Sequence, residues 1–288
     1  MTAKTTATGR REKLKTLIDS GQTLIVPGAF DAISAKLIEQ AGFPAVYVGS
    51  FATAASRLGQ PDVGVSTLDD LVGHAQSIVD AVSVPVIADA EGGLNRAANV
   101  WRTIEAFERA GVSAIHIEDH IAGKHTSFPR QLRSIKDMSN MISAAVEART
   151  DPSFLIIART DIAWVNDDPG LAVERLNAFT LAGADIVFPA GFAPKRLKAV
   201  RDQIKGRVVM TNWKGASVKD EEEAGLSIVI YYGFCLYAAY HGMEKALAAF
   251  KKNGNWNKIA EVTGSIEPFD KLISAASFED RAKKYGLE

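Results

Sequence analysis

Acidic side chains end several short apolar runs of the sequence, where they could bind a divalent cation together. Asp89 and Glu91 lie at the end of one run, Glu118 ends the next, and Asp62 lies in a loop after an earlier run. Clustered carboxylates raise one another's pKa unless a cation neutralises them, and an all-oxygen ligand set suits Mg²⁺ or Mn²⁺. We therefore predict a Mg²⁺ site, which Mn²⁺ could also occupy. The alternative is that each carboxylate only caps a following helix, because acids favour helix N-termini.

Other polar groups at the ends of apolar runs indicate anion binding. Arg159 ends the run 154–160, and its planar guanidinium suits bidentate binding of a carboxylate. The alternative for Arg159 is a structural pair with a neighbouring acid. Ser50 and the amides that follow it could form a small anion-binding nest, although Gly-Ser turns are also common without such a function. Asn212 ends a further run and is another candidate for substrate binding.

The apolar runs that carry these residues predict the fold. Eight runs are nearly continuous rather than alternating, which is typical of parallel strands buried on both faces. They cover residues 24–30, 45–50, 84–90, 113–119, 154–160, 184–190, 207–212 and 226–232, with helices predicted at 31–40, 67–82, 96–109 and 135–149. Ala-Gly pairs that could end helices precede four of the runs. Eight such units predict a TIM-type (β/α)8 barrel, with a doubly wound sheet as the alternative. A barrel brings the C-terminal ends of its strands, and so these candidate residues, to one face.

Composition narrows the class of protein. Of the 288 residues, 47% are hydrophobic and 23% are charged, which is ordinary for a globular protein. The 33 basic and 34 acidic residues nearly cancel, so we expect no nucleic-acid partner. The single cysteine excludes an internal disulfide and a multi-cysteine metal site. No apolar stretch is long enough to span a membrane, and the N-terminus does not read as a secretory signal. We expect one cytoplasmic barrel domain over residues 1–288, with an N-terminal arm at 1–15 and a helical extension at 255–288.

The chain resembles the isocitrate lyase / phosphoenolpyruvate mutase superfamily from about residue 20 to residue 250. The matching segments are PGAFDAISAKLIEQAGF, GSFATAASRLGQPDVG, VPVIADAEGGLNRAANV, AIHIEDH, IIARTD and LSIVIYYGFCLYAA. The resemblance implies that Asp89 binds Mg²⁺. It implies that Glu91 and Glu118 bind the metal directly or through water, and that Asp62 supports the metal's water shell.

The same resemblance implies how the substrate is held. Ser50 and Arg159 match ligands of the substrate carboxylate, and the amides of Phe51 and Ala52 match a pair that stabilises an enolate oxygen. The shared chemistry of the superfamily passes through an enolpyruvate-like oxyanion beside the metal. A cation and backbone amides would lower the energy of such a developing enolate.

Departures from the pattern point to a divergent branch. Lyases of the isocitrate and methylisocitrate type carry K-[KR]-C-G-H in a mobile loop, where this chain has KHTSF at 124–128. Lys124 is kept, but Thr126 takes the cysteine position, and a hydroxyl is a far weaker acid than a thiol. These lyases also have a glutamate where this chain has Ala190. Cleavage of isocitrate or methylisocitrate is therefore disfavoured. Lys124, Thr126 and Arg159 remain the candidate catalytic residues.

The sequence favours a carbon–carbon lyase that cleaves a small 2-hydroxy- or 2-oxo-carboxylate, alkylmalate-like or oxaloacetate-like, through an enolate. One alternative is a carbon–phosphorus enzyme, either a phosphoenolpyruvate/phosphonopyruvate mutase or a hydrolase, and another is a non-catalytic barrel. Apolar residues surround the predicted helix at 234–250, so more than one of its faces must be buried. Superfamily members exchange this helix between partners, which implies a homo-oligomer, a tetramer with an exchanged eighth helix. The alternative is that the residues after Asn255 cover the helix within one chain.

Overall fold

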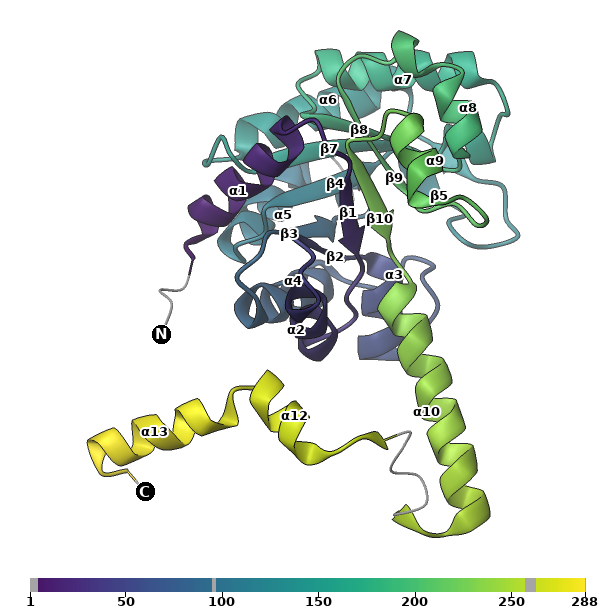
Figure 1. The fold of residues 1–288 in the computed structure, drawn as a ribbon. Coiled ribbons are helices and arrows are strands. Elements are labelled where there is room, and N and C mark those ends of the chain that lie inside the picture. The colour runs from purple at the N-terminus through teal and green to yellow at the C-terminus, as the bar shows by residue number, and fades with distance from the viewer. Residues whose placement is uncertain (1–4, 95–96, 257–262, 288) are drawn as a thin grey trace. The chain divides into compact units, whose positions relative to one another are not determined.

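The computed structural model describes residues 5–94, 97–256 and 263–287. The chain divides into two compact units, residues 1–233 and residues 234–288, where the sequence had suggested one domain. In the first unit, eight parallel strands form a single sheet that curls into a nearly closed barrel (Figure 1). Their order is β1-β10-β9-β8-β7-β4-β3-β2, and a bridge between Gly28 and Tyr47 joins the two end strands. The predicted TIM-type barrel is confirmed.

All eight predicted strands are present, each shorter than its apolar run by one to three residues. They are β1 (Leu24–Pro27), β2 (Val46–Val48), β3 (Val86–Asp89), β4 (Ala114–Glu118), β7 (Leu155–Thr160), β8 (Ile186–Pro189), β9 (Arg207–Thr211) and β10 (Ile228–Tyr231). Most of their residues are buried, including Asp89, Glu118 and Thr160 at their C-terminal ends. The barrel interior is filled by one hydrophobic cluster, to which strand residues such as Val26, Ile87, Ile157, Phe188 and Ile230 contribute.

Helices surround the barrel (Figure 1). The larger ones are α2 (Ala32–Gln40), α4 (Leu68–Ala81), α5 (Ala97–Arg109), α6 (Ile135–Ala148) and α7 (Pro169–Leu181). Short helical segments follow four strands: α3 (Ser50–Thr53) and the π-helical turn Ala54–Leu58 follow β2, and the 3-10 turn Ile162–Trp164 follows β7. α8 (Pro194–Lys198) and the 3-10 turn Arg201–Gln203 follow β8, and α9 (Val218–Glu223) follows β9. The four predicted helices agree with the structure to within one residue where the ends are described, and the predicted start at Arg96 lies outside the described residues. Gly42, Gly111, Gly183 and Gly225 have φ between 77° and 104°, as expected of helix stops.

The expected N-terminal arm is instead largely helical. Residues Ala7–Asp19 form α1, which Thr6 caps by accepting a hydrogen bond from the Gly9 amide. Leu14 and Ile18 of α1 join the barrel cluster, whose members include the first residues of several strands. α1 therefore closes the N-terminal end of the barrel. This helix was not predicted from the sequence because Arg11 lies on its buried face, where it donates to backbone carbonyls of residues 108 and 112.

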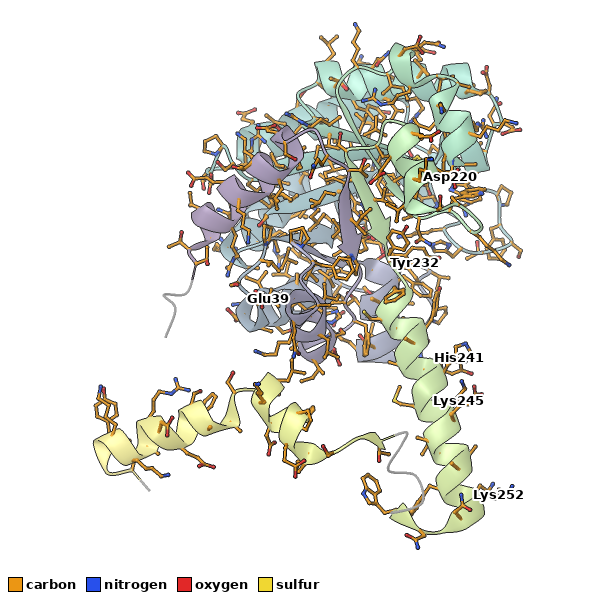
Figure 2. The ribbon with its side chains drawn as sticks, viewed as in Figure 1. Glu39, Asp220, Tyr232, His241, Lys245 and Lys252 are labelled. Atoms are coloured by element: carbon orange, nitrogen blue, oxygen red, sulfur yellow. The ribbon has the colours of Figure 1, made fainter. Side chains whose placement is uncertain are left out.

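The second unit is helical. It contains α10 (Phe234–Asn253), α12 (Ile266–Leu272) and α13 (Ala275–Tyr285). Side chains such as His241, Lys245 and Lys252 project from α10 (Figure 2), and no side chain of α10 is buried. The expected extension from residue 255 thus belongs to a unit that begins earlier, at Phe234. Among the described residues of both units, no helix combines the length and hydrophobicity needed to cross a bilayer.

Candidate active site

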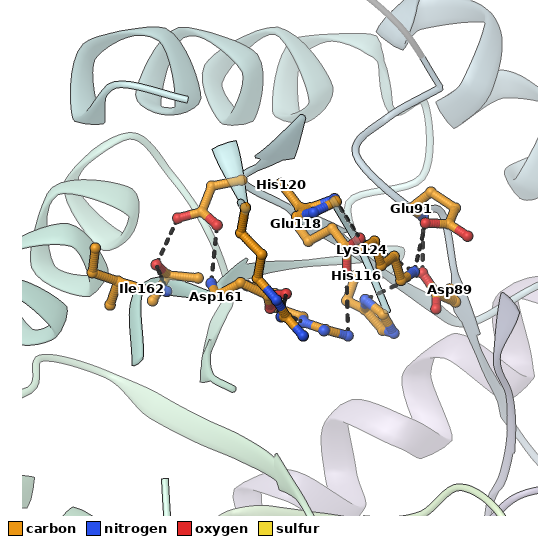
Figure 3. Close-up of polar contacts among 12 residues, drawn as sticks. Asp89, Glu91, His116, Glu118, His120, Lys124, Asp161 and Ile162 are labelled. Atoms are coloured by element: carbon orange, nitrogen blue, oxygen red, sulfur yellow. Dashed lines mark hydrogen bonds and ion pairs between the residues drawn. The ribbon is translucent and has the colours of Figure 1, made fainter. Parts of the chain in front are cut away.

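The C-terminal ends of β3 and β4 bring three carboxylates together (Figure 3). Asp89 ends β3 and Glu118 ends β4, and the parallel register pairs Asp89 with His116 and Glu118 with Arg159. Glu91 follows β3 in the left-handed backbone region, with φ 52°, a conformation that costs a non-glycine residue about 1–2 kcal/mol. All three carboxylates are buried. Negative charge is therefore concentrated where water does not screen it.

The ammonium group of Lys124 lies among these carboxylates. Its Nζ is 2.6 Å from Glu91 Oε2, 3.2 Å from Glu118 Oε1 and 3.5 Å from Asp62 Oδ2. Lys124 belongs to the loop 123–133, which the antiparallel pair β5 (His120–Ala122) and β6 (Gln131–Leu132) holds at its base. The loop begins at Gly123, with φ 83°, where a Cβ atom would lie 2.6 Å from a backbone oxygen across the turn. This turn directs Lys124 into the site.

Ser50 connects β2 to the same cluster. Its Oγ donates to Asp89 Oδ2 at 2.8 Å and lies 3.1 Å from Asp62 Oδ2, and its backbone amide also donates to Asp89 Oδ2 at 3.2 Å. Lys124 Nζ donates to Ser50 Oγ at 3.2 Å. Ser50 opens α3, so the amides of Phe51 and Ala52 belong to the first turn of this short helix. The hydroxyl is therefore engaged with the acidic cluster in this arrangement.

Crowding of charge shifts the pKa values of the cluster. The pKa of Glu91 is raised to about 8, and burial is the largest cause. Repulsion from Asp89, Glu118 and Asp62 also raises this pKa, whereas the attraction of Lys124 lowers it. Burial alone would lower the pKa of Lys124, but the surrounding carboxylates outweigh it and raise that pKa well above its usual range. Lys124 is therefore a cation at neutral pH, and the carboxylates around it outnumber it.

Arg159 lies on the other side of Glu118. Its NH1 is 3.2 Å from Glu118 Oε2, and its Nε donates to Asp161 Oδ1 at 2.7 Å. The guanidinium carbon lies 5.2 Å from the centre of the Phe188 ring. Burial would lower the pKa of Arg159, but Asp161 and Glu118 raise it well above its usual value. The structural pairing considered for Arg159 is present, and the residue also lines a cavity.

Two cavities adjoin Lys124. The smaller, about 260 Å³, is lined by seven predicted site residues: Ser50, Phe51, Ala52, Asp62, Asp89, Lys124 and Arg159. Its other walls include Tyr47, Trp164, Phe188, Ala190, Gly191, Thr211 and Tyr232. The larger, about 790 Å³, is lined by Glu91, Glu118, Lys124 and His120, among others. The structure thus divides the predicted metal-binding residues between two cavities that meet at Lys124.

Two predicted site residues do not line either cavity. Thr126 is exposed, and its hydroxyl donates to the Gly123 carbonyl and accepts from the Phe128 amide within the loop itself. The expected catalytic function of Thr126 has no support in this arrangement, because its hydroxyl stabilises the turn. Asn212 is half-buried, and its backbone amide donates a hydrogen bond to the Ile230 carbonyl. The strand residue before it, Thr211, lines the smaller cavity instead.

Sequence reasoning missed the aromatic lining of the smaller cavity. Tyr47 Oη lies 2.8 Å from His116 Nε2, and His116 Nδ1 lies 3.5 Å from Asp89 Oδ1. Burial lowers the pKa of His116, so the ring is neutral at pH 7. For Tyr47 a sequence signal was available, since it lies in the predicted strand 45–50 and alternate residues of a barrel strand face inward. Trp164 and Tyr232 lie in segments after strands, where no periodic pattern marks them.

The donor set fits a hard divalent cation in its chemistry. Asp62, Asp89, Glu91 and Glu118 supply only oxygen, as Mg²⁺ and Mn²⁺ prefer. Glu91 Oε1 is buried and accepts no hydrogen bond from the described part of the chain, and neither do the oxygens of Glu118, which lie near Lys124 and Arg159. In the arrangement of the described residues, no group of three or more His, Cys, Asp or Glu side chains surrounds a position that could hold a metal ion.

The structure defines a TIM barrel with a buried acidic cluster at its mouth and a guanidinium beside one cavity. The chain belongs to the phosphoenolpyruvate phosphomutase family, whose sequence model matches residues 14–251. This confirms the resemblance found in the sequence.

Individual relatives cover nearly the whole chain. A 2,3-dimethylmalate lyase of Eubacterium barkeri is 34% identical over 95% of this chain and 97% of its own. A 2-methylisocitrate lyase of Shewanella oneidensis is 30% identical over 93% of this chain and 94% of its own. The solved phosphoenolpyruvate phosphomutase of Streptomyces platensis subsp. rosaceus superposes with a TM-score of 0.90 at 27% identity, over 96% and 99% of the chains. A phosphonopyruvate hydrolase solved with oxalate and Mg²⁺ superposes with a TM-score of 0.86 at 26% identity, over 96% and 99%.

Proposed function

We propose that this protein is a Mg²⁺-dependent lyase that cleaves a carbon–carbon bond of a small 2-hydroxy- or 2-oxo-dicarboxylate. The relatives that are 34% and 30% identical to it are named as lyases, so the class of carbon–carbon lyase predicted from the sequence is confirmed. The finer proposal concerns the substrate, an alkylmalate-like or oxaloacetate-like acid. It is carried by one observation: the guanidinium of Arg159 and two of the acidic residues, Asp62 and Asp89, line the same small cavity.

The size and lining of that cavity support a small, partly apolar acid. Its volume of about 260 Å³ suits a compact molecule, and Arg159 offers a planar fork for one carboxylate. Trp164, Phe188 and Ala190 supply apolar walls that would accept alkyl groups. Ala190 stands where the isocitrate-type lyases have a glutamate, which favours an alkyl substituent there over a third carboxylate. These features favour an alkylmalate.

The acidic cluster is the proposed site for the cation. Asp89, Glu91 and Glu118 would hold Mg²⁺ directly or through water, with Asp62 supporting its water shell. When bound, the metal would supply Lewis-acid stabilisation of substrate oxygens. The phosphonopyruvate hydrolase that was solved with oxalate and Mg²⁺ supports the pairing of a dicarboxylate with this cation.

The residues of the chain have distinct proposed functions in cleavage. In an alkylmalate, the hydroxyl proton passes to a general base, a carbonyl forms, the neighbouring carbon–carbon bond breaks, and its electron pair passes to the released carbon as an enolate. That carbon then takes up a proton. Arg159 and Ser50 would hold the substrate carboxylate, and the amides of Phe51 and Ala52 would donate to an oxygen that becomes negative. Lys124 keeps its proton at Nζ at neutral pH, so we assign it as a cation or proton donor and not as a base.

A carbon–phosphorus reaction is the second candidate. It is favoured by the close superposition on a phosphoenolpyruvate phosphomutase. A phosphonate carries more charge than a carboxylate and needs more cationic partners. Lys124 is already surrounded by acids, and His125 Nε2 lies 3.6 Å from Asp62 Oδ2. The charges of this site therefore favour the carboxylate substrate.

A substrate panel tests the proposal. Purified protein with MgCl₂ is incubated with 2,3-dimethylmalate, oxaloacetate, 2-methylisocitrate or phosphonopyruvate, and products are identified by proton and phosphorus NMR. We expect cleavage of 2,3-dimethylmalate or oxaloacetate. Conversion of phosphonopyruvate alone would establish the second candidate, and the absence of any turnover would favour a non-catalytic barrel.

We also propose a homo-oligomer, a tetramer in which α10 is exchanged between subunits. Large apolar side chains of α10 are exposed within its own unit, among them Phe234, Tyr240, Met243 and Leu247. Such a helix needs a partner surface to bury them. Light scattering at micromolar concentration should give a multiple of 30.9 kDa, and a stable folded monomer would contradict the exchange. A cytoplasmic location remains a prediction.

A further inference from the structure

One buried carboxylate touches both the active site and the loop 123–133. Asp161 follows β7 and is completely buried. Its Oδ1 accepts a hydrogen bond from Arg159 Nε at 2.7 Å, and its Oδ2 accepts one from Arg130 NH1 at 3.2 Å. Arg159 lines the smaller cavity, whereas Arg130 belongs to the loop. Asp161 lies beside the acidic cluster in Figure 3.

Asp161 is itself held firmly by the residues around it. Its amide donates to Asp119 Oδ1 at 2.9 Å, and Asp119 Oδ2 accepts from the Thr160 hydroxyl at 2.6 Å and from Arg175 Nε at 2.9 Å. The Asp119 carbonyl also accepts from the Arg133 amide at 2.7 Å, at the far end of the loop. The backbone of Asp161 is therefore anchored by hydrogen bonds that do not involve Arg130.

Arg130 also supports one wall of the smaller cavity without lining it. Its guanidinium carbon lies 5.0 Å from the centre of the Trp164 ring, a distance at which a cation and an aromatic face attract each other. The Trp164 ring packs over Gly191, where a Cβ atom would lie only 2.9 Å from the ring. Trp164 and Gly191 both line the cavity, and Arg130 is not among its lining residues in the described part of the chain.

We propose that Asp161 is a positioning residue that couples closure of the loop 123–133 to the orientation of Arg159. Arg130 of the loop and Arg159 of the cavity share this one carboxylate. When Arg130 leaves Oδ2, the buried carboxylate of Asp161 keeps Arg159 as its one arginine partner. The position of this carboxylate, and with it the orientation of the Arg159 guanidinium, then changes. Coupling of this kind is reciprocal: a ligand that fixes Arg159 must favour the closed loop by the same factor. The identity of that ligand, a carboxylate, rests on the proposed function.

The first test needs no ligand. Hydrogen exchange of the amides of residues 123–133, followed by mass spectrometry, reports how often the loop opens. Arg130→Gln and Asp161→Asn should each speed this exchange about fivefold or more, within the usual range of couplings between sites. Arg196→Gln is the matched control, because Arg196 also pairs with one aspartate, Asp167, and stacks on an aromatic ring, yet lies outside the loop.

The second test measures the coupling to Arg159 with oxalate and MgCl₂ as the probe. By calorimetry, Arg130→Gln should weaken oxalate binding by a factor similar to its effect on exchange, and Arg130→Lys should restore part of the affinity. The double variant with Asp161→Asn should be no weaker than Asp161→Asn alone, since Arg130 acts through Asp161. Circular dichroism checks the fold, and Arg130 is partly exposed, so its variants test the idea even if Asp161→Asn does not fold.

The outcomes separate the two proposals. Exchange rates of Arg130→Gln that match those of the wild type would overturn the coupling. So would faster exchange with oxalate affinity within twofold of the wild type. If the wild-type protein does not bind oxalate with MgCl₂, the proposed function fails, and the coupling of the loop to Asp161 still stands or falls on the ligand-free exchange.

Discussion

Replacement of Arg11 by methionine should destabilise the barrel without changing its chemistry. Arg11 is 4% exposed, and it donates from Nε to the Val112 carbonyl at 3.0 Å, from NH2 to the Glu108 carbonyl at 2.6 Å, and from NH1 to Asp151 Oδ2 at 2.8 Å. Methionine keeps most of the aliphatic stem but removes all three donors. The perturbation therefore isolates the polar contacts of α1 from its packing.

The magnitude follows from which acceptors lose their partners. The Glu108 carbonyl keeps a hydrogen bond from the Gly111 amide, and Asp151 keeps bonds from Thr8 and Ser153. Breaking a buried ion pair by removing one partner costs about 3–5 kcal/mol. Because Asp151 retains other donors, we expect the lower half of this range, about 3–4 kcal/mol. This is a large part of the ~5–15 kcal/mol by which domains are usually stable.

Urea unfolding followed by circular dichroism measures this loss. The midpoint should fall by about 1–2 M. Arg10→Met is the matched control, because Arg10 is the neighbouring arginine and its Nε has no hydrogen-bond partner in the described part of the chain; it should cost less than about 1 kcal/mol. The kcat/KM of folded Arg11→Met should equal that of the wild type, since α1 closes the end of the barrel opposite the site. Equal losses in the two variants would refute the reasoning.

Three further predictions concern the site and its surroundings. Arg159→Lys keeps the charge but loses the planar fork, so transition-state binding should weaken by about 1–3 kcal/mol, measured as a fall in kcat/KM. A change in kcat/KM of less than twofold would count against carboxylate binding. Asp89→Ala should abolish Mg²⁺ binding measured by calorimetry, and undiminished affinity would exclude the site. Burial lowers the pKa of His74, whose ring bonds Thr53 and the Phe30 carbonyl. The unfolded chain therefore binds more protons, and stability should fall as pH drops below about 6.5. His74→Gln should flatten this dependence between pH 7.5 and 5.5, and an unchanged slope in urea unfolding would show that His74 does not contribute to it.

The fold was predictable because a strand that is buried on both faces is apolar at almost every position. Continuous apolar runs such as 154–160 and 226–232 are typical of strands covered on both sides, and glycines before strands mark the helix ends. The bounds were less exact at strand ends, since Ser50 already begins a helix. The helix at 7–19 was missed because a buried arginine, Arg11, interrupts its apolar face. That arginine is tolerated because carbonyls at the N-terminal end of the barrel accept its hydrogen bonds.

The site was predictable to the extent that strands carry it. Asp89 and Glu118 end strands and Arg159 is the last residue but one of β7, so barrel geometry alone brings them together. The loop residues Asp62 and Lys124 were found through the family resemblance, and the contacts of other loop residues were not predicted. Nothing in the sequence showed that Thr126 would satisfy its own turn, or that Trp164 would come to line the smaller cavity.

The central claim is carbon–carbon cleavage through an enolate, and cleavage of 2,3-dimethylmalate in D₂O with MgCl₂ tests it most directly. We expect two products, pyruvate and propionate, observed by NMR. The propionate should carry one deuterium at the carbon released from the broken bond, because the enolate takes its proton from solvent-exchanged groups. Asp89→Ala should form neither product. Failure to cleave this acid or oxaloacetate while phosphonopyruvate is converted would contradict the claim.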